Sequence, residues 1–231
     1  KGIKGTIKCN GAKNAVLPLM ASSILFDNTV TLKNVPMGAK DIETMIVLLR
    51  SLGSKVTIFK TKKILKIQNK KKHKLLVKYK YISTMRAGVL AMGALLGKYN
   101  KCLTALSGGC SLGPRPIGYH LAGFQKLNCN YSLKKGYINI FSKNGIKGNN
   151  YRFPKVSVTG TSNLILASVL ANGTTKLKNI SIEPEVIDLI KFLRNGGAKI
   201  NFIGKRTLKI DGVKKLNGHS HYVIGDRIEA F

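Results

Sequence analysis

Apolar residues recur with the spacing of a helix in two stretches that lie far apart in the chain. In each stretch they fall at positions i, i+3, i+4 and i+7, which places them on one face of an α-helix. The positions are Ile42, Met45, Ile46 and Leu49 in the first stretch and Val186, Leu189, Ile190 and Leu193 in the second. Glycine follows both stretches, at Gly53 and at 196–197, and glycine commonly ends a helix. The pattern predicts two amphipathic helices.

Strand-like segments surround both predicted helices. The residues before them read TVTLKNVP in one copy and TTKLKNIS in the other, so that Asn34 matches Asn179. Two alternating segments follow each helix, as in a hairpin. They are Val56–Phe59 with Ile64–Ile67, and Ile200–Ile203 with Leu208–Ile210. The two regions are therefore copies of one unit.

A third, weaker copy lies between these two. Leu121–Leu127 matches the end of the amphipathic helix, and Tyr137–Ile140 matches a strand. A further apolar helix is predicted before each copy. These helices are Ala15–Leu25, Thr84–Leu96 and Thr161–Leu170. Two of them begin with similar tetrapeptides, GAKN at Gly11–Asn14 and GTSN at Gly160–Asn163.

The repeats predict the fold. One unit consists of helix, strand, helix, strand and strand, at about residues 11–72, 80–142 and 154–213. A unit of this size cannot bury two helices and its sheet alone, whereas three units around a pseudo-threefold axis, with helices inside and sheets outside, can. We expect one α/β domain over residues 11–225, with residues 1–10 and 226–231 as edges that lead to a second domain.

The charge of the chain bears on which classes of binding partner are expected. Its 231 residues include 40 Lys and Arg but only 9 Asp and Glu, a net charge of +31. Most of the basic residues are lysines spread along the chain, which is typical of a solvated surface and compatible with a cleft for anionic substrates. No spacing typical of RRM, KH, helix-turn-helix or zinc-finger domains is present, so nucleic acid is not the favoured partner.

Neither a membrane nor a metal is expected as a partner. The longest nearly apolar run, Ala87–Gly97, is far shorter than the roughly 20 residues that cross a bilayer. The four cysteines form no CxxC pair and no secretory leader is visible, so we expect no disulfide framework, no zinc site and a cytoplasmic location. Cys9, Cys102 and Cys129 are expected to be buried.

One segment of the middle copy breaks the repeat. Where the other copies have a short polar loop, it has SGGCSLGPRPIGYH at Ser107–His120. Its glycines make the backbone around Cys110 pliable. Arg115 and a predicted helix start near Ile117 lie close in sequence, and both favour the thiolate form of a cysteine. We interpret Cys110 as an exposed, reactive thiol.

These segments resemble the UDP-N-acetylglucosamine enolpyruvyl transferase family. The matching stretches are GAKNAVLPL (Gly11–Leu19), STMRAGVLAMGALL (Ser83–Leu96), GGCSLGPRPIGYH (Gly108–His120), KVSV (Lys155–Val158), EPEVIDLIKFL (Glu183–Leu193) and DRIEA (Asp226–Ala230). The combination of GAKN with the GGC and RP motifs is highly specific. The resemblance implies an inside-out α/β barrel of repeated units, in agreement with the fold expected from the repeats.

The resemblance also implies a role for each matching residue. Cys110 matches a catalytic cysteine that donates a proton to C3 of phosphoenolpyruvate and can carry a covalent phospholactoyl adduct. Lys13 matches a contact to phosphoenolpyruvate and Asn14 a contact to the sugar nucleotide. Arg86 and Arg115 match arginines that face anionic groups of the substrates. The other implied UDP-sugar contacts are Pro116, Ile117, Gly118, Tyr119, Lys155, Val156, Ser157 and Val158; His120 matches a neighbouring histidine without an assigned role.

The implied reaction is the first committed step of peptidoglycan synthesis. The 3-hydroxyl of UDP-N-acetylglucosamine adds to C2 of phosphoenolpyruvate, and phosphate leaves the resulting tetrahedral intermediate. Preorganised positive side chains stabilise the anionic groups. The implied partners are these two substrates, and neither a metal nor an organic cofactor is implied.

The chain departs from the family pattern at three positions. Gly118 stands where aspartate is usual, Thr159 where glycine is typical, and Phe231 where a small residue is expected. The β-branched Thr159 would be unfavourable if the backbone there required a positive φ.

The resemblance covers only about the first half of such an enzyme. The general base, an aspartate, and further arginines that clamp phosphoenolpyruvate belong to the second domain. We therefore expect the chain to be a fragment, or a degraded remnant, that does not turn over alone. Two alternatives stay open: a shikimate-phosphate enolpyruvyl transferase, against which the Cys110 loop and GAKN argue, and a non-catalytic basic module of the same fold that binds anions or nucleic acid.

Overall fold

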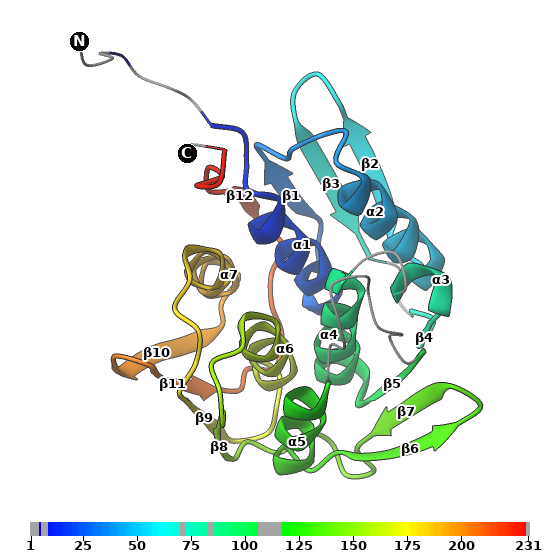
Figure 1. The fold of residues 1–231 in the computed structure, drawn as a ribbon, viewed down its shortest axis with the longest axis vertical. Helices are drawn as coiled ribbons and strands as arrows, with labels where there is room; N and C mark the ends of the chain where they lie inside the picture. Colours follow the sequence, from blue (N-terminus) through cyan, green and yellow to red (C-terminus); the bar gives the residue numbers. More distant parts are fainter. Residues whose placement is uncertain (1–4, 6–8, 70–72, 83–85, 106–116, 230–231) are drawn as a thin grey trace.

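Within the part of the chain that the structure describes, three four-stranded sheets surround a bundle of helices (Figure 1). The computed structural model describes residues 5, 9–69, 73–82, 86–105 and 117–229 of the 231. The helices lie inside and the sheets outside, so the predicted inside-out α/β architecture of three similar units is confirmed. The unit bounds given above stay a prediction.

Each unit contributes three consecutive strands to one sheet, always in the same arrangement. The first strand of the unit pairs antiparallel with the third, and the third pairs antiparallel with the second. The strands are β1 (Val30–Lys33), β2 (Lys55–Phe59) and β3 (Ile64–Gln68); β5 (Lys101–Ala105), β6 (Asn130–Lys134) and β7 (Tyr137–Phe141); and β9 (Thr174–Lys178), β10 (Lys199–Gly204) and β11 (Thr207–Asp211). The predicted hairpins are therefore confirmed.

The fourth strand of each sheet comes from the segment that follows the preceding unit in the chain. β4 (Leu76–Val77) pairs parallel with β5, β8 (Asn150–Arg152) with β9, and β12 (Ser220–Tyr222) with β1. Each unit thus passes a short strand to the next sheet, and the third unit passes its strand back to the first. The alternating pattern did not predict these strands, because two or three residues are too few to show it.

Three helices fill the centre and are buried over most of their surface. They are α1 (Lys13–Ser22), which continues into the 3-10 turn η1 (Ser23–Leu25); α4 (Leu90–Tyr99), which follows the 3-10 turn η2 (Arg86–Val89); and α6 (Val158–Ser168). Glycines allow α4 and α6 to approach closely. A Cβ at Gly93 would overlap the backbone carbonyl of Asn163, and a Cβ at Gly97 would lie 2.5 Å from the carbonyl oxygen of Leu166.

Three amphipathic helices lie between the central helices and the sheets. They are α2 (Lys40–Leu52), α5 (Gly118–Lys126) and α7 (Pro184–Asn195); the short α3 (Tyr79–Ile82) precedes η2. The apolar positions predicted for α2 and α7 are buried. Gly53, at a φ of 117°, ends α2, and Gly197, at a φ of 103°, follows α7. These left-handed conformations explain why glycine stands at the two positions.

Asn34 and Asn179, which match in the repeat, have the same structural role. Both have a positive φ, 62° and 56°. The Asn34 side chain donates a hydrogen bond to the carbonyl of Val223, which follows β12, and the Asn179 side chain donates one to the carbonyl of Phe153, which follows β8. Asparagine tolerates the left-handed region and supplies the amide donor. Each asparagine therefore fastens the strand that arrives from the preceding unit.

A neutral hydrogen-bond network joins the first unit to the end of α4. The Nδ1 atom of His73 lies 2.6 Å from the hydroxyl of Tyr99, and its Nε2 atom lies 3.0 Å from the hydroxyl of Ser54. The Ser54 hydroxyl donates to Asn69. Burial, together with the nearby Lys98 ammonium, lowers the pKa of His73 to about 4. The ring is therefore uncharged at neutral pH.

Candidate functional site

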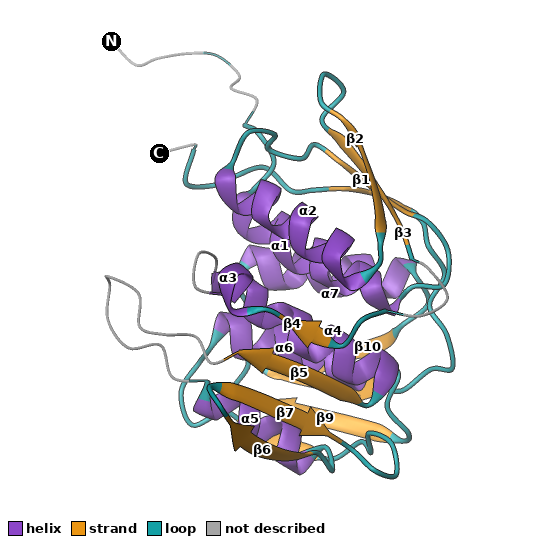
Figure 2. Ribbon diagram, turned by 90° about the vertical axis from the view of Figure 1, so that its right-hand side faces the viewer, coloured by secondary structure: helices purple, strands orange, loops and turns teal. Residues whose placement is uncertain are grey.

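Helices α1, α5 and α6 begin at one face of the molecule, at the left in Figure 2. The N-terminus of a helix carries partial positive charge and unpaired N–H groups, so it attracts anions. Lys13 and Asn14 occupy the first turn of α1, and Gly118 and Tyr119 the first turn of α5. Residues 155–158 lead into α6. The structure thus brings these predicted site residues to the same face.

Lys13 is paired with a carboxylate at this face. Its Nζ atom lies 2.8 Å from Oδ2 of Asp41, in the first turn of α2, and the two side chains are 44% and 31% exposed. The ammonium is therefore oriented but still accessible to solvent. Asn14 beside it is exposed. Asp41 was not predicted as a site residue, because its pairing with Lys13 depends on how α1 and α2 pack.

The glycine of GAKN is required by close packing. A Cβ at Gly11 would overlap the backbone carbonyl of Asn34 at the end of β1. The next amide, that of Ala12, donates a 2.8 Å hydrogen bond to the carbonyl of Ile224, just after β12. The start of α1, and with it Lys13, is therefore fixed against the junction of the first and third units.

The segment at residues 155–158 caps α6. The Ser157 hydroxyl accepts a 3.1 Å hydrogen bond from the backbone N–H of Gly160, as an N-cap serine does. Lys155 is exposed, and Val156 and Val158 are 48% and 43% exposed although they are apolar. Thr159 lies within α6 and has no positive φ, so its β-branched side chain causes no strain.

The first turn of α5 is held from the third sheet. The hydroxyl of Tyr151 in β8 donates a 3.1 Å hydrogen bond to the carbonyl of Tyr119. Ile117 is partly buried, and Gly118 is exposed with open space around the position of a Cβ. An aspartate, usual in the family at position 118, would therefore fit. His120 is buried, and its Nδ1 atom lies 2.8 Å from the side-chain nitrogen of Asn163 in α6.

Several predicted site residues lie outside the described part of the structure. Cys110, Arg115 and Pro116 belong to the segment 106–116, which is not described. The backbone of Arg86 lies in η2, but its side chain is not described. The roles expected for these four residues stay predictions.

Two of the other three cysteines are too deeply buried to be candidates for chemistry. Cys102 and Cys129 are buried as expected, and burial raises the pKa of each thiol to about 12. Cys9 is only partly buried, contrary to expectation, because it precedes α1 at the edge of the molecule. Within the described residues, no His, Cys, Asp or Glu side chains form a group of three that could hold a metal ion.

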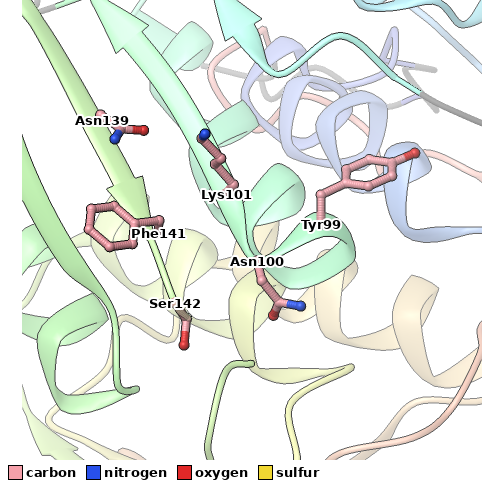
Figure 3. Close-up of a pocket in the computed structure, with 6 residues that line it drawn as sticks. All are labelled: Tyr99, Asn100, Lys101, Asn139, Phe141 and Ser142. Atoms are coloured by element: carbon pink, nitrogen blue, oxygen red, sulfur yellow. The ribbon is translucent and has the colours of Figure 1, made fainter. Parts of the chain in front are cut away.

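An open cavity of about 410 Å³ lies away from this face. Figure 3 shows its lining, which comes from the end of α4 and from strands β5 and β7. The lining residues are Tyr99, Asn100, Lys101, Asn139, Phe141 and Ser142. None of them was predicted as a site residue, and the cavity adds nothing to the candidate site. In the described part of the chain, no helix has the length and apolar character needed to cross a bilayer.

Comparisons with known proteins place the chain among carboxyvinyltransferases. The family model for EPSP synthase (3-phosphoshikimate 1-carboxyvinyltransferase) matches residues 1–231. UDP-N-acetylglucosamine 1-carboxyvinyltransferase of Pelagibacter ubique is 46% identical over 228 residues, and that of Magnetococcus marinus is 44% identical over 227. The matches cover 99% and 98% of this chain but 54% of each relative. The predicted resemblance is confirmed, and the chain spans about half the length of the curated relatives it matches.

Solved structures show the same fold. The enolpyruvyl transferase NikO from Streptomyces tendae superimposes with a TM-score of 0.84 at 15% identity, over 99% of this chain and 53% of that one. An EPSP synthase from Acinetobacter baumannii superimposes with a TM-score of 0.71 at 19% identity, over 97% of this chain and 51% of that one. At these identities the likeness concerns the fold alone.

Proposed function

The chain belongs to the carboxyvinyltransferase family that the EPSP synthase model describes, and from this premise we propose a specific reaction. The protein transfers the enolpyruvyl group of phosphoenolpyruvate to the 3-hydroxyl of UDP-N-acetylglucosamine and releases phosphate. The product serves peptidoglycan synthesis, and the reaction takes place in the cytoplasm.

One observation carries this proposal: relatives at 40–46% identity, matched along nearly the whole chain, are named UDP-N-acetylglucosamine 1-carboxyvinyltransferase. The EPSP synthase structure, at 19% identity, is much more distant in sequence. The sugar nucleotide is therefore favoured over shikimate phosphate as the acceptor. The GAKN tetrapeptide and the cysteine in GGCSLGPRP support the same choice.

The proposed chemistry is addition followed by elimination. The sugar oxygen bonds to C2 of phosphoenolpyruvate while Cys110 gives a proton to C3. Loss of phosphate from C2 and of a proton from C3 then restores the double bond. A thiol of ordinary pKa is mostly protonated at neutral pH and can act as this acid. The thiol can also add across the same double bond, which forms a covalent adduct on Cys110.

Positively charged side chains would hold the anionic groups of the substrates. In this proposal Lys13 contacts phosphoenolpyruvate, and Arg86 and Arg115 face anionic groups of the substrates. The UDP-sugar is contacted by Asn14, by residues 116–119 and by residues 155–158. The exposed Lys13 ammonium, held by Asp41, is suited to such a contact because it needs no burial or deprotonation before binding.

We propose that the general base lies outside these 231 residues. The chain covers 54% of the first two relatives, so those proteins have room for a second domain of similar size. An aspartate of that domain would take the proton of the sugar hydroxyl. In this proposal the 231 residues alone bind substrate but do not complete the reaction.

Mass spectrometry tests the role of Cys110. The protein is incubated with phosphoenolpyruvate and UDP-N-acetylglucosamine, digested, and the peptide that contains Cys110 is weighed. We expect a gain equal to one phosphoenolpyruvate in the wild type and in Cys129→Ser, whose thiol is buried, but none in Cys110→Ser. If full-length Cys110→Ser protein released phosphate as the wild type does, the role assigned to Cys110 would be contradicted.

A binding titration separates this function from that of a non-catalytic module. We expect UDP-N-acetylglucosamine to bind with little dependence on added DNA. A basic anion-binding module would instead bind DNA with an affinity that falls steeply with salt, and would not respond to the sugar nucleotide.

A further inference from the structure

The side chain of Asn163 replaces a backbone hydrogen bond at the start of α4. Its Oδ1 atom accepts a 2.8 Å hydrogen bond from the N–H of Gly93, and its Nδ2 atom donates a 3.0 Å hydrogen bond to the carbonyl of Val89. In a regular helix the N–H of residue 93 would bond to the carbonyl of residue 89. The amide of Asn163 is inserted between these two groups, at the junction of η2 and α4.

These two bonds fix the orientation of the Asn163 amide. If the amide were reversed, Nδ2 would face the N–H donor of Gly93 and Oδ1 would face the carbonyl acceptor of Val89, so both bonds would be lost. Asn163 is 0% exposed, so water could not replace them. A buried polar group without a hydrogen-bond partner lowers the stability of the folded protein by about 1–3 kcal/mol. The amide is therefore held in the observed orientation.

The fixed amide determines the state of the His120 ring. The Nδ2 atom has two hydrogens: one goes to Val89, and the other points to Nδ1 of His120 at 2.8 Å. Nδ1 must therefore accept, and it cannot carry a hydrogen of its own. The ring is then neutral with its hydrogen on Nε2. Asn163 thus acts on two segments of the candidate site, η2, which contains Arg86, and the first turn of α5.

We propose that Asn163 is a positioning residue that joins these two segments and keeps His120 in its neutral, Nε2-protonated form. The proposal rests on the proposed function in so far as η2 and the start of α5 contact substrate. The contacts themselves come from buried, described residues and do not depend on the reaction. The close approach of Gly93 in α4 and Gly123 in α5 to α6 leaves the three helices little freedom to adjust around Asn163.

NMR of the 15N-labelled chain measures the ring directly, because the shifts of Nδ1 and Nε2 distinguish the two tautomers and the charged form. The spectrum of His120→Gln identifies the His120 signals among the four histidines. We expect an unprotonated Nδ1 and a protonated Nε2 in the wild type. In Asn163→Asp, which keeps an acceptor for Gly93 but has no N–H for His120, we expect the hydrogen to move to Nδ1.

Two outcomes would overturn the proposal. One is a wild-type ring protonated on Nδ1, which needs no variant to detect. The other is a folded Asn163→Asp protein whose His120 spectrum is unchanged. The matched control is Ser168→Ala, in the same helix and equally buried, whose hydroxyl has no partner among the described residues. It should leave the His120 signals as in the wild type.

Ligand binding gives a second readout that separates this proposal from the proposed function. We expect Asn163→Asp to weaken UDP-N-acetylglucosamine binding by about tenfold, which corresponds to the loss of one hydrogen bond. Ser168→Ala should bind as the wild type. If the wild type binds no UDP-sugar, the proposed function fails, whereas the ring measurement still decides the role of Asn163.

Discussion

Asp188 of α7 accepts a 3.0 Å hydrogen bond from Nε2 of His221 in β12, and both residues are buried. His221 pairs with Leu32 of β1. The contact therefore fastens a helix of the third unit to the strand that this unit gives to the first sheet. The ring of Phe192 meets the His221 ring edge-on, with centroids 5.2 Å apart, and fills the space around the pair.

Removal of one partner of this pair should destabilise the fold strongly. Asp188→Ala leaves the His221 ring buried without its acceptor, and we expect a loss of about 3 kcal/mol in the free energy of unfolding, measured by urea denaturation. Asp27→Asn, which breaks the exposed pair with Lys98, is the control and should cost less than about 1 kcal/mol. If both variants lost the same free energy of unfolding, the buried pair would contribute no more to stability than the exposed pair.

The pKa of His73 predicts a loss of stability in mild acid. The pKa of His73 is about 4 in the folded chain against the ordinary histidine value of 6.5, so between these two pH values the unfolded chain binds more protons. Stability should therefore fall by up to about 3 kcal/mol as the pH decreases from about 6.5 to 4. Denaturation curves across this range measure it. His73→Gln should be less stable at pH 7 and should lose this part of the slope; an unchanged slope would refute the assignment.

Gly118→Asp should stabilise the chain. Gly118 opens α5 in open space, so the change removes the flexibility of glycine and places a negative charge at a helix N-terminus. We expect a gain of about 1 kcal/mol, seen as a rise in Tm of a few degrees. Gly118→Ala separates the two contributions, because it supplies a side chain without the charge. A fall in Tm for both variants would show that position 118 requires glycine.

Gly93→Ala should disrupt the centre of the fold. The added Cβ would overlap backbone and side-chain oxygens of Asn163, which cannot move without breaking its bonds to α4. We expect a loss of about 3 kcal/mol or more in the free energy of unfolding. Gly118→Ala again serves as the control. If Gly93→Ala were as stable as the wild type, α4 and α6 would not be in the close contact described here.

Lys13→Met should separate binding from stability. Lys13 and Asp41 are both substantially exposed, so their ion pair should contribute less than about 1 kcal/mol to folding. In the full-length protein the same variant should bind phosphoenolpyruvate at least tenfold more weakly, because an ammonium that contacts the substrate is lost. Calorimetric titration measures this. Unchanged affinity would remove Lys13 from the proposed site.

The parts of the fold that could be predicted are those with a local signal. α2 and α7 bury one face each, so their 3.6-residue period was readable, and Gly53 marked an end correctly. The central helices are apolar on nearly every side, which gives their presence but not their packing partners. The strands β4, β8 and β12 had no signal, since their pairing is decided by the neighbouring unit.

The candidate site divides in the same way. GAKN and KVSV were recognisable as motifs, whereas Asp41 and Asn163 matter through contacts with residues distant in sequence. Although GTSN resembles GAKN in sequence, the two tetrapeptides lie at different places relative to their helices. Gly11 precedes α1 whereas Gly160 lies inside α6, so Asn14 is exposed at the face and Asn163 is buried among helices.

The return of β12 to β1 also affects the order in which the protein can be completed during translation. The second and third sheets can each acquire all four strands soon after their own unit has been made. The first sheet must wait for residues 220–222, although its other strands are synthesised by residue 68. In a nascent chain one edge of β1 therefore stays unpaired until residues 220–222 have emerged from the ribosome, and in that interval the edge is open to aggregation or to a chaperone.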